Sequence, residues 1–344
     1  MLKKSVFLIV LFVLCSSFVL GETIPPTISF ETPTPTGTIN TDSMTITTSS
    51  SDANDISTFI DFDNSLVAWW RFDDFDGSII SDSSGNGNIG SLVGNSVIGS
   101  NFGHLGDGLE LPGANDIVVV PDSPSLDTIS NGLTICLWQN SNSANGVGGS
   151  IIGKRIAGSD DAWQLTGDNG GLHFMIWIGG VGTAISKPAS NVIGSWSHSC
   201  ATFDGNQMKL YSDSLFVGSK ALIGSIDITN DPVHIGRSYS SSYAYNGKLD
   251  DVMVFNKALS QGEITALYLG TSPKSLTKSF TNLGEGSHTF KAYSQDTSGN
   301  VGSVERTVII DLITAQEVID KTEQWVEDIA TVEEVVTTIE SYSG

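Results

Sequence analysis

The sequence predicts an all-β protein made of two β-sandwiches, one inserted into the other, with a helix at the carboxyl end. Runs of about four to eight residues rich in Val, Ile, Thr, Phe and Trp recur up to about residue 312, and each closes on Gly, Asn, Asp or Pro. Strands at this spacing, with turns between them, are typical of sandwiches. The 344 residues exceed the roughly 250 to 300 that one core accommodates, so we expect more than one domain.

The first 21 residues have the composition of a signal peptide. Lys3 and Lys4 precede an uncharged apolar run over 5–20, and the small residue Gly21 follows it. The run is shorter than the ~20 residues of a membrane crossing, so cleavage is favoured over the alternative of an uncleaved anchor helix. We therefore expect a secreted or cell-surface protein with no membrane span after cleavage.

Two flanking segments, 22–64 and 273–312, are rich in Thr and Ser, and each offers about three short strands. Neither can bury a core alone, whereas together they make one sandwich of ordinary size. The economical interpretation is one domain interrupted by an insertion at 65–272. Insertion is tolerated when the guest's termini lie close together. Two independent small modules are the alternative.

The segment 313–344 changes character to a helix. Apolar or neutral residues recur at intervals of four and three, as in a heptad seam, and six glutamates face the single Lys321. The seam consists of Val318, Thr322, Trp325, Ile329, Val332, Val336 and Ile339. This seam predicts a homo-oligomer that forms through the helix. The alternatives are that the helix docks on the sandwich or that it is the start of a longer region.

Charge and cysteines limit the partners. The formal net charge is −22, and nucleic acid is an unsuitable partner because phosphate binding needs clustered Lys and Arg. Cys15 leaves with the signal peptide, so Cys136 and Cys200 remain. An even pair in an oxidising compartment favours a disulfide, with two buried free thiols as the alternative.

Two stretches carry a family resemblance. Residues 66–94 read LVAWWRFDDFDGSIISDSSGNGNIGSLVG, and residues 246–267 read NGKLDDVMVFNKALSQGEITAL. Both resemble the LamG-like jelly-roll domain, which opens on an aromatic strand with a DSSGNGN-type loop and closes on a Leu-Asp-Asp strand. The resemblance covers roughly 65–269 and implies a concanavalin A-like jelly-roll sandwich, here inserted into an Ig-like β-sandwich.

The middle region is also similar to pentraxins, and this similarity implies a bridge between Cys136 and Cys200. The acid-rich loop that holds paired calcium ions in pentraxins is missing, because residues 234–247 contain no carboxylate. The flanks resemble bacterial or archaeal Ig-like repeats through GEGSHTFKAYSQDTSGNVGS at 284–303. That resemblance implies a spacer on a surface protein.

The loop that begins at Asp82 places oxygen side chains at alternate positions with Gly87 at the sixth, as a calcium loop does. Val93 stands where an EF-hand needs a bidentate Glu, so an EF-hand is rejected. What remains is one structural Ca²⁺ site that the family resemblance completes from the Leu-Asp-Asp strand. Its candidate ligands are Asp82, Ser84, Asn86, Asn88, Asp250 and Asp251. An Asx turn without metal is the alternative.

Catalysis is not expected. Retaining glycosidases of this fold need two carboxylates about 5 Å apart, yet no Glu occurs from 111 to 262, and the adjacent Asp160 and Asp161 would point to opposite faces of a strand. No Gly-x-Ser-x-Gly motif is present. We therefore predict a binding protein and no enzyme.

Aromatic residues are the candidate ligand contacts. Trp69 and Trp70 are adjacent and must face opposite ways on a strand, so at least one is expected outside the central core. The Tyr/Ser-rich loop at 239–245 is the other plausible surface; a core tryptophan and a solvated loop are the alternatives. The candidates are Trp69, Tyr239, Tyr243 and Tyr245.

We expect a glycan or an extracellular protein as the partner. The alternatives are a spacer without a small ligand and an accessory module of carbohydrate-active enzymes.

Overall fold

The computed structural model describes most of the chain between residues 23 and 312 and part of the carboxyl-terminal helix. The predicted signal peptide at 1–21 and most of the heptad segment lie outside the described residues, although 322–327 are helical. Where the chain is described, no helix is long and apolar enough to cross a bilayer. The described ranges are 23–53, 56–142, 149–155, 161–168, 171–188, 193–237, 243–268, 275–312, 317, 319–320, 322–327 and 329.

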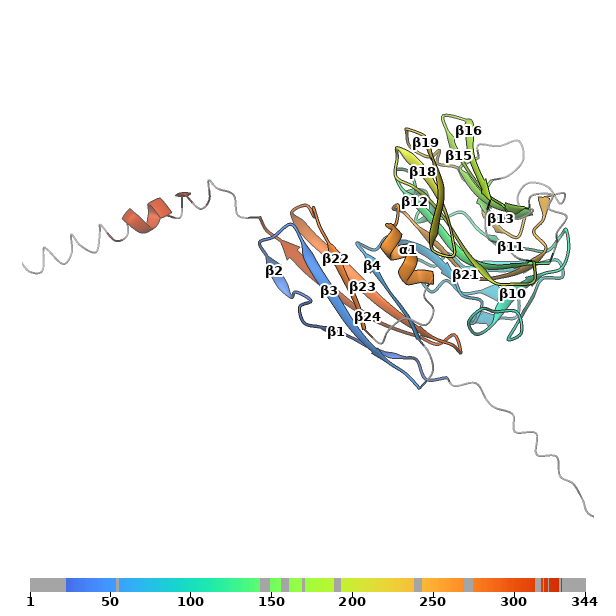
Figure 1. The fold of residues 1–344 in the computed structure, drawn as a ribbon, viewed down its shortest axis with the longest axis horizontal. Coiled ribbons are helices and arrows are strands. Elements are labelled where there is room, and N and C mark those ends of the chain that lie inside the picture. Colours follow the sequence, from blue (N-terminus) through green and yellow to red (C-terminus); the bar gives the residue numbers. More distant parts are fainter. Residues whose placement is uncertain are drawn as a thin grey trace, which may run out of the picture.

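The smaller sandwich consists of two sheets, and each sheet takes strands from both flanks of the chain (Figure 1). Strand β22 pairs with β3, and β23 pairs with β4, in both cases antiparallel. One sheet has the order β1 (Thr27–Glu31), β3 (Met44–Ser51), β22 (Ser275–Phe280). The other has the order β2 (Gly37–Ile39), β24 (Val301–Ile310), β23 (Gly286–Asp296), β4 (Ile56–Phe62).

The core of the smaller sandwich follows from strand alternation. Strand β3 is buried at every second position from Met44, as a strand with one face on a core must be. Its inward residues meet aromatic and aliphatic side chains of the opposite sheet, among them Phe62, Phe290 and Val308.

The larger sandwich also has two sheets. The eight-stranded sheet has the order β19 (Leu215–Ala221), β18 (Gln207–Ser212), β17 (Ser197–Phe203), β12 (Leu133–Ser141), β21 (Gly247–Phe255), β10 (Gly108–Leu111), β9 (Val97–Gly99), and β5 (Leu66–Trp70) pairs with β21. The nine-stranded sheet has the order β16 (Val181–Pro188), β15 (Gly171–Ile178), β14 (Trp163–Asp168), β13 (Gly149–Lys154), β20 (Val233–Ile235), β11 (Ile117–Val120), β8 (Gly90–Val93), β7 (Ile79–Ile80), β6 (Phe75–Asp76). A 3-10 turn, η1, spans Leu126–Thr128.

The main core lies between these two sheets. Trp70, Leu165 and Phe174 belong to it, whereas Trp69 belongs to a second cluster. The prediction that the two adjacent tryptophans face opposite ways is therefore confirmed. The predicted all-β class is confirmed as well.

The second cluster joins the two sandwiches. It covers the outer face of the eight-stranded sheet with helix α1 (Gln261–Tyr268) and with Phe59 and Tyr293 of the smaller sandwich. Phe59 stacks on Tyr293 with ring centroids 5.0 Å apart and meets Trp69 edge to face at 5.4 Å. Figure 1 shows α1 beside β4, on the side of the larger sandwich that faces the smaller one. One face of the larger sandwich is thus occupied by packing.

Helix α1 begins with a capping box. The Ser260 N–H donates to Oε2 of Glu263 at 2.7 Å, and the Glu263 N–H reaches back to Oγ of Ser260 at 3.4 Å. Its inward residues Ile264 and Leu267 pack on the sheet. The sequence Ser-Gln-Gly-Glu therefore sets where the helix starts.

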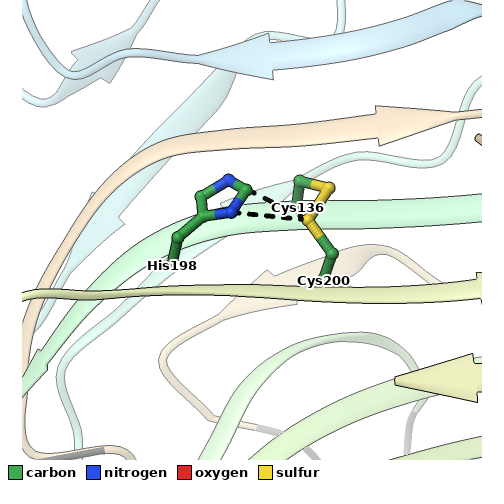
Figure 2. Close-up of side chains that lie close together, drawn as sticks. All are labelled: Cys136, His198 and Cys200. Atoms are coloured by element: carbon green, nitrogen blue, oxygen red, sulfur yellow. Dashed lines mark hydrogen bonds between the residues drawn. A yellow bond between two sulfur atoms is a disulfide. The ribbon is translucent and has the colours of Figure 1, made fainter. Parts of the chain in front are cut away.

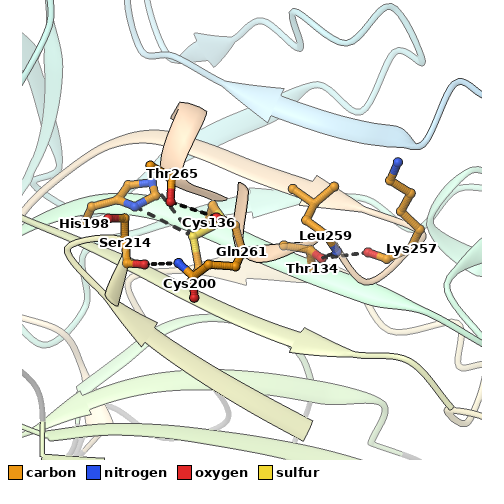
Figure 3. The surroundings of a disulfide bond; sticks show 9 residues. All are labelled: Thr134, Cys136, His198, Cys200, Ser214, Lys257, Leu259, Gln261 and Thr265. Atoms are coloured by element: carbon orange, nitrogen blue, oxygen red, sulfur yellow. Dashed lines mark hydrogen bonds between the residues drawn. A yellow bond between two sulfur atoms is a disulfide. The ribbon is translucent and has the colours of Figure 1, made fainter. Parts of the chain in front are cut away.

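The predicted disulfide between Cys136 and Cys200 is confirmed, with an S–S distance of 2.05 Å. The two cysteines stand directly opposite each other in the antiparallel pair of β12 and β17, with Cα atoms 4.2 Å apart. Figure 3 shows the bridge beneath the start of α1, where Gln261 donates to the carbonyl of Ser214. The bridge lies in the cluster that joins the sandwiches.

Candidate ligand-binding face

The predicted calcium loop is a turn organised by the carboxylate of Asp82. Its Oδ1 accepts the N–H groups of Trp69 and Ser84, each at 2.9 Å. Its Oδ2 accepts the Ser84 hydroxyl at 2.8 Å and the Asn88 N–H at 2.9 Å. Both oxygens are therefore engaged by donors of the protein.

The asparagines of this loop turn their amide nitrogens inward. Asn86 and Asn88 donate to the carbonyl of Val67 at 2.9 and 2.8 Å. The oxygen of Asn88 accepts the hydroxyls of Ser123 and Ser125 at 2.6 and 3.0 Å. The loop is thus tied to β5 and to the turn before η1 by hydrogen bonds.

The two aspartates of the Leu-Asp-Asp strand point to other partners. Asp250 accepts the N–H groups of His104 and Leu105 at 2.7 and 2.9 Å, and Asp251 accepts Nε1 of Trp69 at 2.9 Å. Burial and the neighbouring Asp251 charge raise the pKa of Asp250 well above its usual value. Burial also raises the pKa of Asp251 to about 6.

Protein donors thus engage the Asp82 and Asn88 oxygens, as in an Asx turn. Calcium binding itself stays a prediction. Among the described residues, metal-ligand spacing is met by Cys136, His198 and Cys200. Figure 2 shows the two sulfurs bonded to each other, with His198 beside Cys200. Disulfide sulfurs are not the thiolates that bind metals.

The predicted aromatic contacts are mostly buried. Trp69 is 0% exposed and Tyr245 is 3% exposed, so neither has the surface to stack on a ligand. Their assignment as ligand contacts is corrected to core packing, because the smaller sandwich covers the face that carries Trp69 and the main core encloses Tyr245. Tyr243 is 40% exposed. Tyr239 lies outside the described residues.

The outer face of the nine-stranded sheet differs from the covered face. In β15 the residues Leu172, Phe174 and Ile176 face the main core, so the alternate residues His173 and Met175 face outward. Within the described chain, helix α1 contacts β4 and β19 and makes no packing layer on β13, β14 or β15. We call this outer surface of β13–β16 and β20 the open face.

A chain of polar side chains crosses the open face. Arg155 donates to Asp161 at 2.7 Å and to Oε1 of Gln164 at 2.9 Å, and Nε2 of Gln164 donates to Oγ of Ser150 at 3.0 Å. Gln164 is 4% and Ser150 0% exposed. Strand pairing explains the geometry, because Gln164 lies opposite Gly153, which has no side chain to separate it from Arg155 and Ser150.

Aromatic and imidazole groups border this polar chain. The Arg155 guanidinium lies over the Trp177 ring, 4.7 Å from its centroid. His173 bonds the Ser186 hydroxyl on the neighbouring strand β16. Trp177 is itself buried, so its ring serves to hold the Arg155 guanidinium in place on the face.

Two nitrogen groups near the edge of the open face lack a hydrogen-bond partner within the described chain. Nδ1 of His234 and Nε of Arg237 are buried and unpaired. Burial, and then the Arg237 charge, lowers the pKa of His234, so its imidazole is neutral at pH 7. A neutral imidazole can both donate and accept, which suits a hydroxyl-bearing ligand.

Sequence reasoning missed the polar chain of Arg155, Gln164 and Ser150. The alternation of His173, Met175 and Trp177 with Leu172, Phe174 and Ile176 was the available signal, since it marks two different faces of one strand. The sequence contains no comparable sign of which face is covered.

The comparison with known families bears on this sandwich. Residues 112–265 match the family model of the concanavalin A-like lectin/glucanases superfamily. We call the larger sandwich the lectin-like sandwich, and all five strands of its open face lie within the matched residues. The predicted fold family is thereby confirmed for this part of the chain.

The chain is also similar to individual proteins. Human Pentraxin-4 is 25% identical over 182 residues, which are 48% of this chain and 37% of that protein. The receptor-binding domain of botulinum neurotoxin C/D mosaic serotype is 16% identical with a TM-score of 0.51, over 60% of this chain and 52% of that one. Domain 4 of an extracellular arabinanase from Geobacillus stearothermophilus, solved with arabinotriose, is 17% identical with a TM-score of 0.46, over 59% and 98%. The chain thus spans about a third to a half of Pentraxin-4 and of the neurotoxin chain.

Proposed function

We propose that the lectin-like sandwich binds an uncharged oligosaccharide on the open face, without catalysis. The observation that carries the proposal is the contrast between the two outer faces. Packing against α1 and the smaller sandwich occupies one face. On the other face, the buried Gln164 and Ser150 support the Arg155 guanidinium, which is the part of this polar chain that a ligand can reach.

The chemistry of the open face suits sugar hydroxyls. Sugar hydroxyls exchange hydrogen bonds with guanidinium and imidazole groups that are held in place, as Arg155 and His173 are here. Asp161 neutralises Arg155 at 2.7 Å, and the formal charge of −22 repels polyanions. These charges favour a neutral glycan over an acidic one.

Two features typical of exported proteins support a role outside the cell. The amino-terminal residues have signal-peptide composition, and a structural disulfide is typical of oxidising compartments. The Ig-like smaller sandwich would hold the lectin-like sandwich at a defined orientation on a surface. The receptor-binding domain among the proteins of similar fold is consistent with a binding role.

A glycan array probed with the full chain tests the proposal, followed by calorimetry on each oligosaccharide bound. We expect Gln164→Ala to weaken binding about fivefold, because Arg155 loses the acceptor that holds it in place and its hydrogen bond to the sugar, worth about 1 kcal/mol, is lost. Gln207→Ala is the matched control, since Gln207 bonds Ser219 on the other sheet as Gln164 bonds Ser150. Equal losses in both variants, or no bound oligosaccharide, would favour a spacer without ligand.

A further inference from the structure

A cavity lies at the joint between the sandwiches, away from the open face. It has a volume of about 260 Å³ and opens between α1, β4 and β22. Its wall is almost wholly apolar and includes Phe59, Ile60, Phe255, Leu259, Leu267 and Leu276. Water gains few hydrogen bonds in such a space, so an apolar group is its natural occupant.

One cation stands at the mouth of this cavity. Lys278 lines it, and its Nζ donates to Oγ of Ser260 at 3.3 Å. Gly262 lies beneath the ammonium group, and a β-carbon there would come within 2.9 Å of Nζ. Among the described residues Lys278 has no carboxylate within ion-pair distance.

Glu263, the carboxylate that also lines this mouth, already has partners within the protein. Oε1 of Glu263 accepts Nζ of Lys257 at 3.1 Å, and Oε2 accepts the Ser260 N–H at 2.7 Å. The capping box and the Lys257 ion pair therefore hold Glu263 away from Lys278. The mouth keeps one positive charge, on Lys278, that no carboxylate of the described residues neutralises.

We propose that this cavity binds a small amphiphile with an unbranched apolar body and a carboxylate head, the head pairing with Lys278. A volume of about 260 Å³ holds roughly nine groups of water size, close to the heavy-atom count of octanoate. The apolar wall receives the chain, and the unpaired ammonium receives the head. This site is separate from the open face, so its ligand does not depend on glycan binding.

Chain length is the first test, with calorimetry of the full chain against hexanoate, octanoate, decanoate and octanol below their micelle concentrations. Each methylene should strengthen binding about fourfold, because burying one is worth about 0.8 kcal/mol. The gain should stop once the cavity is full. An affinity that rises by the same factor from octanoate to decanoate as from hexanoate to octanoate, or saturable binding of none of the acids, overturns the proposal.

Substitution is the second test. Lys278→Gln should weaken octanoate about three- to tenfold and leave octanol unchanged, whereas the control Lys291→Gln on β23 should alter neither. Ala266→Phe fills the cavity and should abolish binding of both, with unchanged thermal unfolding as proof of folding. If octanoate does not bind and Ala266→Phe changes the tryptophan emission, the occupant of the cavity is the chain's own carboxyl-terminal helix. If octanoate does not bind and Ala266→Phe changes the sedimentation coefficient, the occupant is a second copy of the chain. Either result contradicts the binding of an amphiphile.

Discussion

At the scale of single residues, two buried histidines show how the joint is held. His104 stacks on Trp138 with ring centroids 3.6 Å apart, and His198 lies 5.1 Å from the same tryptophan. Burial lowers the pKa of His104 to about 4 and that of His198 to about 3. Both imidazoles are therefore neutral in the folded protein over the physiological pH range.

These pKa values predict a loss of stability in acid. Because the unfolded histidines titrate near 6.5, the unfolded state takes up protons first as the pH falls from 6.5 towards 4 and 3. His198→Phe should remove part of this slope, on the order of 2 kcal/mol between pH 7 and pH 4.5. Urea unfolding of both proteins at the two pH values measures it; parallel changes in wild type and variant would contradict the burial of a neutral His198.

Asp82 gives the second prediction at this scale. It accepts four hydrogen bonds in the loop after β5, so Asp82→Ala should lower the free energy of unfolding by about 3 kcal/mol. Since its oxygens are engaged by protein donors, the melting temperature should be the same in excess calcium and in chelator. A clear rise in calcium would restore the metal site that the sequence predicts.

At the scale of secondary-structure elements, the pairing of β12 with β17 explains the disulfide. The bridge closes a loop of sequence separation 64, which in the chain-entropy model corresponds to about 4 kcal/mol of stabilisation. The double variant Cys136→Ser/Cys200→Ser should unfold at correspondingly lower urea concentration. Reduction of the wild type should reproduce the shift; a bridge whose loss costs nothing would show that the packing of α1 alone holds this region.

The elements also show what sequence can and cannot predict. The family resemblance implied a Leu-Asp-Asp strand within 246–267, and the structure has it as β21, Gly247–Phe255. Apolar patterns and turn signals predicted the all-β class. They could not predict that both faces of β5 are buried, because Trp69 is covered by residues far away in sequence, Phe59 and Tyr293. For the same reason the polar chain of the open face was missed: periodicity marks two faces, and only tertiary packing decides which one is covered.

At the scale of the whole molecule, the smaller sandwich acts as a cover for the lectin-like one. Trp69, Met253 and Phe255 would lose this cover if 65–269 were produced alone. We expect the isolated segment to melt at lower temperature than the full chain and to bind a hydrophobic dye, because a contiguous apolar patch becomes exposed. Equal melting temperatures and no dye binding would mean that the two sandwiches are independent.

The central claim is that one face of the lectin-like sandwich binds ligand because the other is occupied by packing. Hydroxyl-radical footprinting of the full chain, with and without a saturating oligosaccharide from the array, tests it most directly. We expect protection of His173 and Met175 on β15, with the exposed Phe216 on β19 of the other sheet unchanged. Protection confined to the smaller sandwich or to the loop after β5, with β15 unaffected, would contradict it.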